Sequence, residues 1–217
     1  MEKLVDDGLV KHIGVANFPV ILLHDMLSYA RIPPAVNQVE IHPYNQQSQL
    51  LEYCRAHNIV VQAYSPLGSP GYKESVEPEV LSDPILKEIA NKHEISVAQL
   101  CILWSLQRGC HLIAKSSNSQ HMEENLLMYH RYEFAESTTS ITCEEDMDII
   151  ATTTTGGTTI PTAGKTTTLV LSLEEMERIA SLDRGYRFFR PEDWWKENPV
   201  PVFHWKESEE RDAMYGL

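Results

Sequence analysis

The sequence predicts an α/β fold in which about four βα units form half of a (β/α)8, or TIM, barrel. Short apolar strands alternate with amphipathic helices over residues 9–128, a pattern typical of a parallel sheet. Each unit takes roughly 30 residues, whereas a closed barrel takes about 250. We expect no further unit before Lys11, so the 217 residues comprise half a barrel, a Thr-rich insertion and an aromatic C-terminal tail.

Each predicted strand is a short apolar run that ends at turn-forming residues. The four strands are KHIGV at 11–15, AVNQVEI at 35–41, NIVVQAY at 58–64 and CHLIA at 110–114. The predicted helices lie at 20–30, 49–57, 85–92, 97–108, 120–128 and 173–182. Strand and helix therefore alternate four times before the Thr-rich segment interrupts the pattern.

Helix starts are marked by side chains that can accept hydrogen bonds from free backbone N–H groups. The expected starts are Ser48, Ser82-Asp83-Pro84, Ser96 and Ser172. Glu175 completes a capping-box pattern with Ser172. Helical spacing places Trp104 and Met122 in the expected core, and the residues expected on one face of the first helix are Ile21, Leu22, Met26, Leu27 and Tyr29.

The charge balance excludes some classes of partner. With 18 Lys and Arg against 31 Asp and Glu, the net charge is −13, which argues against non-specific nucleic-acid binding. No apolar run reaches the roughly 18 residues that a membrane-spanning helix needs. The N-terminal residues lack the apolar core of a signal peptide, so we expect a cytoplasmic protein.

The four cysteines show no metal-binding or disulfide pattern. Cys54, Cys101, Cys110 and Cys143 have no CxxC spacing and no accompanying His motif. We therefore expect reduced thiols that pack as small apolar side chains, and no metal site.

The chain is expected to divide at a low-complexity segment. Residues 1–132 form the half-barrel, 133–171 a Thr-rich insertion, and 172–217 a helix and tail that pack on the barrel. Thirteen threonines fall between Thr138 and Thr168, and this composition favours disorder. TIPTAGKT at 159–166 lacks the first glycine of a P-loop and has no strand before it, so we do not expect nucleotide hydrolysis there.

Polar residues follow each predicted strand, at the end of a βα barrel where ligands collect. They are Asn17, Gln38, Tyr64-Ser65 with the loop through Ser69, and Lys115-Ser116-Ser117-Asn118. Amides, hydroxyls, one aromatic ring and one ammonium group suit a flat, anionic ligand. The last group suits a phosphate at a helix N-terminus, although the same residues could simply cap the helix.

Other interpretations of these residues stay open. Asn17 and Gln38 could be ordinary hydrogen-bonding residues at strand ends, and Tyr64 could be a core aromatic. Glu40, His42 and Tyr44 could form a metal or acid–base cluster, but packing within the His42-Pro43 turn is the favoured interpretation.

Four segments together resemble the aldo-keto reductases, and among them the aldose and xylose reductases. These segments are GVANF at 14–18, AVNQVEIHPY at 35–44, VVQAYSPLGSP at 60–70 and KSSNSQHMEEN at 115–125. DRGYRFF at 183–189 is similar to the start of that family's C-terminal tail. The resemblance implies the C-terminal half of a TIM barrel that reduces an aldehyde, ketone or sugar by hydride transfer from NADPH.

The resemblance also implies roles for residues at the strand ends. Asn17 and Gln38 would hold the nicotinamide carboxamide, and Tyr64 would stack on the nicotinamide ring. The residues expected along the pyrophosphate are Ser65, Leu67 and Ser69. Those expected at the 2′-phosphate and ribose are Lys115, Ser116 and Asn118, with Glu124 and Asn125 near the adenine.

Two positions depart from the family pattern. Ala16 stands where a hydroxyl residue usually contacts the carboxamide, which removes a hydrogen bond of about 0.5–1.5 kcal/mol. His121 replaces an Arg that often pairs with the 2′-phosphate, which weakens the preference for NADP over NAD. Lys115 still makes NADP the expected cofactor.

The resemblance covers no part of the family's proton-transfer machinery. Its Asp, Tyr, Lys and His come from the first half of the barrel, so no catalytic residue is assigned here, and Tyr64 and Lys115 do not replace them. We expect a partial version of the reductase, inactive or very weak as an isolated chain. The alternative is a non-catalytic half-barrel that binds nucleotide or assembles with another chain, with self-association through the open edges of the first and fourth strands.

Overall fold

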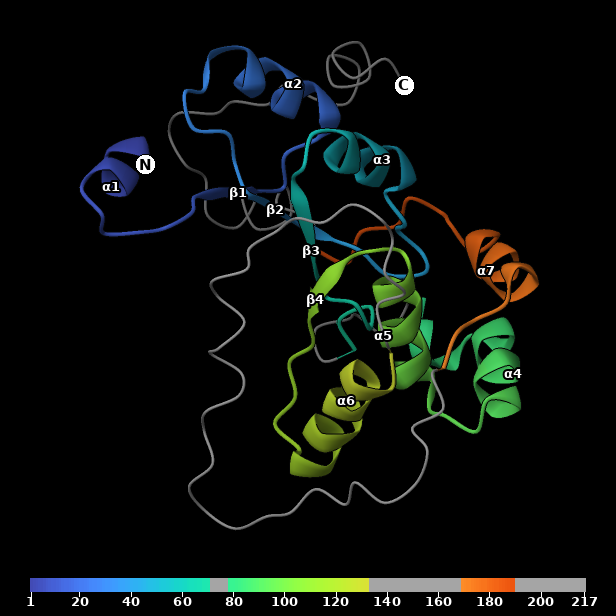
Figure 1. The fold of residues 1–217 in the computed structure, drawn as a ribbon. Helices are drawn as coiled ribbons and strands as arrows, with labels where there is room; N and C mark the ends of the chain where they lie inside the picture. The colour runs from blue at the N-terminus through green and yellow to red at the C-terminus, as the bar shows by residue number, and fades with distance from the viewer. Residues whose placement is uncertain (71–77, 133–168, 190–217) are drawn as a thin grey trace, which may run out of the picture. The chain divides into compact units, whose positions relative to one another are not determined.

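A computed structural model describes residues 1–70, 78–132 and 169–189 (Figure 1). The chain forms two compact units, Met1–Tyr186 and Arg187–Leu217, and almost every described residue belongs to the first. The predictions for the Thr-rich segment and the far C-terminal tail, Cys143 included, lie outside the described residues. No helix in the described ranges is both long and apolar enough to cross a membrane.

The first unit is built on a parallel sheet of four described strands. They are β1 (Gly14–Ala16), β2 (Val36–Glu40), β3 (Val60–Tyr64) and β4 (His111–Ile113), in the order β1-β2-β3-β4. The register aligns Ala16 with Gln38, Glu40 with Tyr64, and Tyr64 with Ile113. The sheet is open over the described residues, which confirms the prediction of a partial α/β barrel.

Helices lie between consecutive strands and after the last strand, and one short helix precedes the first strand. They are α1 (Glu2–Asp6), α2 (Val20–Tyr29), α3 (Ser48–Ala56), α4 (Pro84–Lys92), α5 (Val97–Gln107), α6 (Ser119–Arg131) and α7 (Leu173–Ala180), with a 3-10 turn, η1, at Val80–Ser82. The sequence did not predict α1, which has five residues and is held by long-range contacts. The Arg31 guanidinium lies 2.6 Å from the Asp6 carboxylate, and Glu2 accepts a bond from the Ile32 amide.

Most of the predicted helix starts are confirmed. Asp83 accepts bonds from the backbone N–H groups of Ile85 and Leu86, and Ser96 and Ser172 each form a capping box. The prediction for Ser48 is wrong, because the N-cap is Gln47, which has a left-handed φ of 52° and no capping side-chain bond. The Ser48 hydroxyl instead accepts a bond from Arg108 at 3.0 Å.

The core is centred on α5, where seven of the 11 residues are buried, Trp104 among them. Cys54, Cys101 and Cys110 are also buried, as predicted, and none of them forms a disulfide. Burial raises the pKa of the Cys101 thiol to about 12 and that of Cys110 to about 11. These thiols stay protonated and act as packing groups.

Two helices expose large apolar side chains, and the prediction that Met122 lies in the core is wrong. Ile21 and Tyr29 on α2 are 64% and 70% exposed, and Leu23 is the buried residue of that helix. Met122 on α6 is 50% exposed. Both helices follow edge strands of the described sheet, so each has a neighbouring described strand and helix on one side only.

Polar contacts hold α7 against α4 and α5. The Gln107 side chain makes two bonds of 2.8 Å with the backbone of Leu171, just before α7. The Glu175 carboxylate accepts bonds from Lys92 at 2.6 Å and from His93 at 3.0 Å. A segment distant in sequence is thereby fixed beside α4 (Figure 1).

Candidate cofactor site at the strand ends

Asn17 and Tyr64 meet at the carboxyl ends of β1 and β3. Asn17 has a left-handed φ of 58°, a conformation that Asn tolerates better than most residues. Its backbone N–H donates to the carbonyl of Gln38 at 2.8 Å. The Tyr64 hydroxyl donates to Asn17 Oδ1 at 3.1 Å. The structure therefore brings three of the predicted residues together on three neighbouring strands.

Gln38 has a polar neighbour that the sequence analysis missed. Gln62 is its register partner on β3, and Gln38 Nε2 donates to Gln62 Oε1 at 2.6 Å. The signal was available, because Gln62 and Tyr64 are two residues apart on one strand and point to the same face of the sheet. This face is therefore polar on both central strands close to their carboxyl ends.

The loop after β3 is tightly folded as far as it is described. Ser65 and Ser69 have left-handed φ angles of 51° and 48°, and Gly68 has a φ of 72°. The Ser69 hydroxyl donates to the Ser65 hydroxyl at 2.8 Å, and the Gly68 amide donates to the Ser65 carbonyl at 2.9 Å. Leu67 is half-buried within this turn. Hydroxyl groups thus lie beside the end of β3, next to Tyr64.

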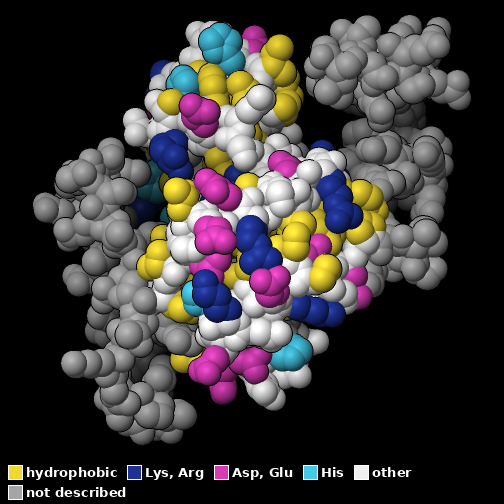
Figure 2. Space-filling model, turned by 90° about the vertical axis from the view of Figure 1, so that its right-hand side faces the viewer, with side chains coloured by type: hydrophobic (Ala, Val, Ile, Leu, Met, Phe, Trp, Pro, Cys, Tyr) yellow, Lys and Arg dark blue, Asp and Glu magenta, His cyan; other side chains and the backbone are white. Residues whose placement is uncertain are grey.

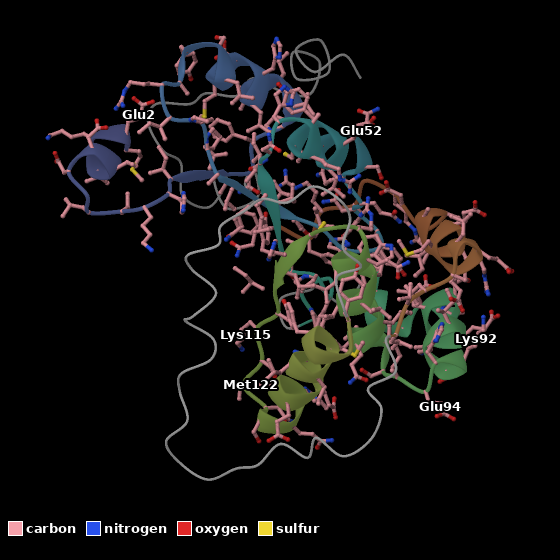
Figure 3. All side chains as sticks on the ribbon, in the orientation of Figure 1. Glu2, Glu52, Lys92, Glu94, Lys115 and Met122 are labelled. Carbon is pink, nitrogen blue, oxygen red and sulfur yellow. The ribbon has the colours of Figure 1, made fainter. Side chains whose placement is uncertain are left out.

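The residues after β4 form a capped helix start with a free cation beside it. Asn118 Oδ1 accepts bonds from the backbone N–H groups of Gln120 and His121, at 2.9 and 3.4 Å. Ser116 Oγ accepts a bond from the Asn118 amide at 3.1 Å. Lys115 is exposed, and its side chain makes no hydrogen bond or ion pair with any residue that the structure describes. Figure 3 shows this side chain at the end of β4, away from the body of the helices.

Glu124 and Asn125 lie further along α6. Gln120 donates to the Glu124 carboxylate at 2.9 Å, and Gln99 of α5 donates to the Glu124 carbonyl at 3.2 Å. Asn125 lines a hollow of about 310 Å³ between β4 and α6. The other residues that line it are Leu112, Ile113, Ala114, Met122, Leu126 and Tyr129.

Glu40 at the end of β2 is buried, as are His42 and Tyr44 in the turn that follows, and all three are hydrogen-bonded. His42 Nε2 lies 3.2 Å from Glu40 Oε1, and the Tyr44 hydroxyl donates to Asp83 at 2.8 Å. Burial and the bond to Asp83 raise the pKa of Tyr44 to about 12. The Arg184 guanidinium covers the Tyr44 ring at 4.3 Å. These contacts agree with the favoured interpretation of a packed turn.

The chemistry available at the strand ends is that of binding. Two amides, an aromatic ring, hydroxyls and an ammonium group can hold a flat, amide-bearing ring and phosphate oxygens. Ala16 contributes no hydroxyl at the end of β1. Within the described ranges, no group of three or more His, Cys, Asp or Glu residues is arranged to hold a metal ion.

Comparison with known proteins identifies the family to which this chain belongs. The profile of the aldo/keto reductase family matches residues 1–144. The chain therefore belongs to the aldo-keto reductase family, and the resemblance found in the sequence is confirmed.

Individual relatives match most of the chain. An aldo/keto reductase of Synechocystis is 38% identical over 198 residues, which is 89% of this chain and 49% of that protein. The NADP-dependent D-sorbitol-6-phosphate dehydrogenase of Malus domestica is 35% identical, over 90% of this chain and 51% of its own length. The NAD(P)H-dependent D-xylose reductase of Hypocrea jecorina is 32% identical, over 94% and 53%. The chain thus spans about half the length of these relatives.

Proposed function

We propose that this chain carries the cofactor-holding half of an NADPH-dependent carbonyl reductase that acts on a small aldehyde, ketone or sugar. The observation that carries the proposal is the meeting of Asn17, Gln38 and Tyr64 at neighbouring strand ends. Two relatives support it by name, one as NADP-dependent and one as NAD(P)H-dependent, with sugar compounds as substrates. Bound there, the cofactor would supply hydride to the carbonyl carbon of the substrate.

The side chains at the strand ends fit the nicotinamide end of such a cofactor. The amides of Asn17 and Gln38 can both donate to and accept from a carboxamide. The Tyr64 ring offers a flat apolar surface on which the nicotinamide would stack, which fixes the face that is presented to the substrate. The bond from Tyr64 to Asn17 holds the ring and one amide in fixed relation before the cofactor arrives.

The segment after β4 fits the phosphate on the adenosine ribose. Lys115 is an exposed cation there with no partner among the described residues, and Ser116 and Asn118 lie next to it. Asn118 already caps α6, so its side chain positions the helix start while Lys115 would supply the charge. His121 would meet the same phosphate, and Ser65, Leu67 and Ser69 would lie along the pyrophosphate. Glu124 and Asn125 would lie nearest the adenine.

Hydride transfer to a carbonyl also needs a proton donor for the carbonyl oxygen. No residue at these strand ends is assigned to that step. We therefore expect the 217-residue chain alone to oxidise NADPH very slowly or not at all with glyceraldehyde or xylose. Substantial turnover would contradict the view that the proton-transfer groups lie outside this chain.

Fluorescence titration of the purified chain tests cofactor binding. NADPH should bind more tightly than NADH because only NADPH offers a phosphate to Lys115. Replacing Tyr64 by Ala should weaken the binding of both cofactors strongly, whereas Tyr64→Phe keeps the ring, loses only the bond to Asn17 and should weaken binding much less. If Tyr64→Ala binds both cofactors unchanged, the stacking role is wrong.

A second candidate function is a half-barrel that binds nucleotide or assembles without catalysis. The observation that favours it is the open sheet, whose edge strands β1 and β4 are each paired on one side in the described residues. Tight NADPH binding without turnover would favour this candidate. Absence of NADPH binding would exclude a half-barrel that binds nucleotide and would leave only a half-barrel that assembles with another chain.

A further inference from the structure

Charged side chains are spread over the surface of the first unit, whereas the amide of Asn37 on β2 is fully buried. Figure 2 views the molecule from the side on which Figure 1 places α4 and α7, and it shows acidic and basic side chains interspersed there. Arg178 and Glu88 form one exposed pair of this kind. A buried amide, by contrast, is costly unless hydrogen bonds replace those that it would make with water. The partners of Asn37 therefore indicate what this residue does.

Asn37 lies on the opposite face of the sheet from the candidate cofactor residues. It directly precedes Gln38 on β2, and neighbouring residues of a strand point to opposite faces. Its register partners on the adjacent strands are Val15 and Val61, so the strands around it are apolar at this level. The Cys54 thiol of α3 hydrogen-bonds Asn37, although burial still raises the pKa of that thiol. Asn37 therefore faces the helices and does not line the face on which Gln38 lies.

The Asn37 amide bonds both backbone groups of a single residue after β1. Its Nδ2 donates to the Phe18 carbonyl at 2.9 Å, and its Oδ1 accepts from the Phe18 N–H at 3.4 Å. Together the two bonds fix the orientation of the amide, because only its nitrogen can donate and only its oxygen can accept. The N-cap of α2 is Pro19, which makes no side-chain capping bond. The turn between β1 and α2 is therefore held from β2, by the side chain of Asn37.

The bonds on either side of Asn17 fix its backbone conformation. The Asn17 N–H donates to the Gln38 carbonyl at 2.8 Å, which holds the peptide plane before Asn17. The Phe18 N–H, held by Asn37, belongs to the peptide plane after Asn17. The φ and ψ angles of a residue are the rotations that relate these two planes, so holding both planes holds both angles. The left-handed φ of 58° at Asn17, a strained conformation for a residue other than glycine, is thereby maintained.

We propose that Asn37 is a positioning residue of the strand-end site, which holds Asn17 in this conformation and so places the Asn17 amide beside Tyr64. The Tyr64 hydroxyl donates to Asn17 Oδ1 at 3.1 Å. With an extended backbone at Asn17, the chain would leave β1 in another direction and carry the amide away from that hydroxyl. The inference rests on the proposed function, because it concerns the orientation of an amide that would hold the nicotinamide. It adds to the site a residue that the cofactor does not contact.

Fluorescence titration of the full chain with NADPH and NADH tests the effect on the ligand. Asn37→Leu keeps a similar side-chain volume but removes both bonds to Phe18. The substitution should weaken NADPH binding by about threefold to tenfold. NADH binding should weaken by the same factor, because the two cofactors share the nicotinamide.

Asn45→Leu is the matched control for Asn37→Leu. Asn45 is also buried and donates to a backbone carbonyl, that of Glu40, at 2.8 Å. It holds the turn after β2, however, and not the turn after β1. Asn45→Leu should therefore lower the stability of the chain but leave both affinities nearly unchanged. Equal weakening of cofactor binding by Asn45→Leu would overturn the proposal.

A double-mutant cycle tests whether Asn37 acts through Asn17. Asn17→Gly removes the amide, and glycine takes a left-handed φ without strain. If Asn37 serves to place that amide, adding Asn37→Leu to Asn17→Gly should weaken cofactor binding no further. A purely structural role of Asn37 would make the two losses multiply, and that result would contradict the positioning role. Circular dichroism checks that each variant folds.

Amide hydrogen exchange followed by NMR tests the contact between Asn37 and Phe18 without any ligand. In the original chain, the Phe18 N–H should exchange at least about tenfold more slowly than the N–H of the exposed Ser117. This comparison needs no variant, so it decides the question even if Asn37→Leu does not fold. In a folded Asn37→Leu chain, the protection at Phe18 should be lost. An unprotected Phe18 N–H in the original chain would overturn the proposal.

The two measurements separate failure of this inference from failure of the proposed function. If the original chain binds NADPH and a folded Asn37→Leu chain binds it equally well, Asn37 does not position the site, and the proposed function stands. If the original chain binds neither cofactor, the proposed function fails, and the role of Asn37 toward the cofactor fails with it.

Discussion

In the centre of the sheet, β2 and β3 are each paired on both sides, and the neighbouring helix α5 has seven of 11 residues buried. At the flanks, β1 and β4 are each paired on one side within the described part of the chain, and α2 has one buried residue among its ten. Both regions are built from apolar helical sequences. The comparison therefore shows that the hydrophobic pattern of a helix determines which of its faces can be buried, and that the neighbouring elements determine whether that face is buried.

The centre is further stabilised by contacts between segments distant in sequence. Gln46 Nε2 donates to the carbonyl of Ile179 at 2.7 Å, and Arg178 pairs with Glu88 through two bonds. Such contacts tie α7 to the strands and helices of the centre. We expect the centre to unfold last and the flanks to depend on whatever covers them.

The largest expected effect comes from truncating the same residue type in the two regions. Leu103 on α5 is completely buried, so Leu103→Ala should lower the free energy of unfolding by about 2–5 kcal/mol. Leu127 on α6 is 44% exposed, and Leu127→Ala should change the free energy of unfolding by less than about 1 kcal/mol. Urea denaturation followed by circular dichroism measures both. Equal losses would contradict the distinction between centre and flank.

The next effect concerns the carboxylate that anchors α7. Burial alone would raise the pKa of Glu175, but bonds from Lys92, from the Ser172 amide and from His93 lower it to about 2. Its unfolded pKa is about 4.3, so this stabilisation is present above that pH and is lost as the pH falls toward 2. Glu175→Gln should lower the free energy of unfolding by about 1–3 kcal/mol at neutral pH. The variant should also lose less stability than the original chain when the pH is lowered.

Glu174→Gln serves as the matched control for Glu175→Gln. Glu174 is exposed on the same first turn of α7 as Glu175. It therefore lies equally close to the start of the helix but does not make the buried contacts of Glu175. Urea unfolding at a series of pH values below neutrality should separate the two variants. An unchanged acid profile in Glu175→Gln would mean that other carboxylates dominate it.

Local signals in the sequence predicted most of the secondary structure. All four strands, the helix start at Ser96 and the capping box at Ser172 were predicted, because alternation and capping depend on residues close in the chain. The predicted strand at 11–15 is instead Gly14–Ala16, since the ladder begins where β2 is in register. Ser48 was misassigned because its partner, Arg108, lies 60 residues away.

The site was predictable in part for the same reason. Turn-forming residues after each strand marked Asn17 and Tyr64, but the bond that joins them spans 47 residues and follows from strand order. Gln62 could have been found from its alternation with Tyr64. Met122 could not have been placed correctly, because helical spacing shows that a face is apolar and not that a neighbour covers it.

A smaller effect is expected from the turn after β2. Tyr44→Phe removes the hydroxyl that donates to Asp83 and should lower the free energy of unfolding by about 1 kcal/mol. Asp83 keeps its two bonds to the start of α4, so the helix should remain. Thermal unfolding of Tyr44→Phe beside Tyr53→Phe, whose ring is half-buried on α3, measures the difference. A larger loss at Tyr53 would show that the Tyr44 contact is unimportant to the centre.

The smallest effect on folding is expected at Lys115, where the flank is proposed to bind a ligand. Lys115→Ala should leave the free energy of unfolding unchanged within about 0.5 kcal/mol, because its side chain has no partner in the described structure. The substitution should weaken NADPH binding by about tenfold or more, because a charge-assisted bond of about 1.5–3 kcal/mol is lost. NADH binding should be almost unaffected. Lys87→Ala, exposed on α4, is the matched control. If Lys115→Ala weakens the binding of both cofactors equally, the ammonium group acts on the part of the cofactor that NADPH and NADH share. The preference for NADPH must then come from another residue at the flank, and His121 is the next residue to test.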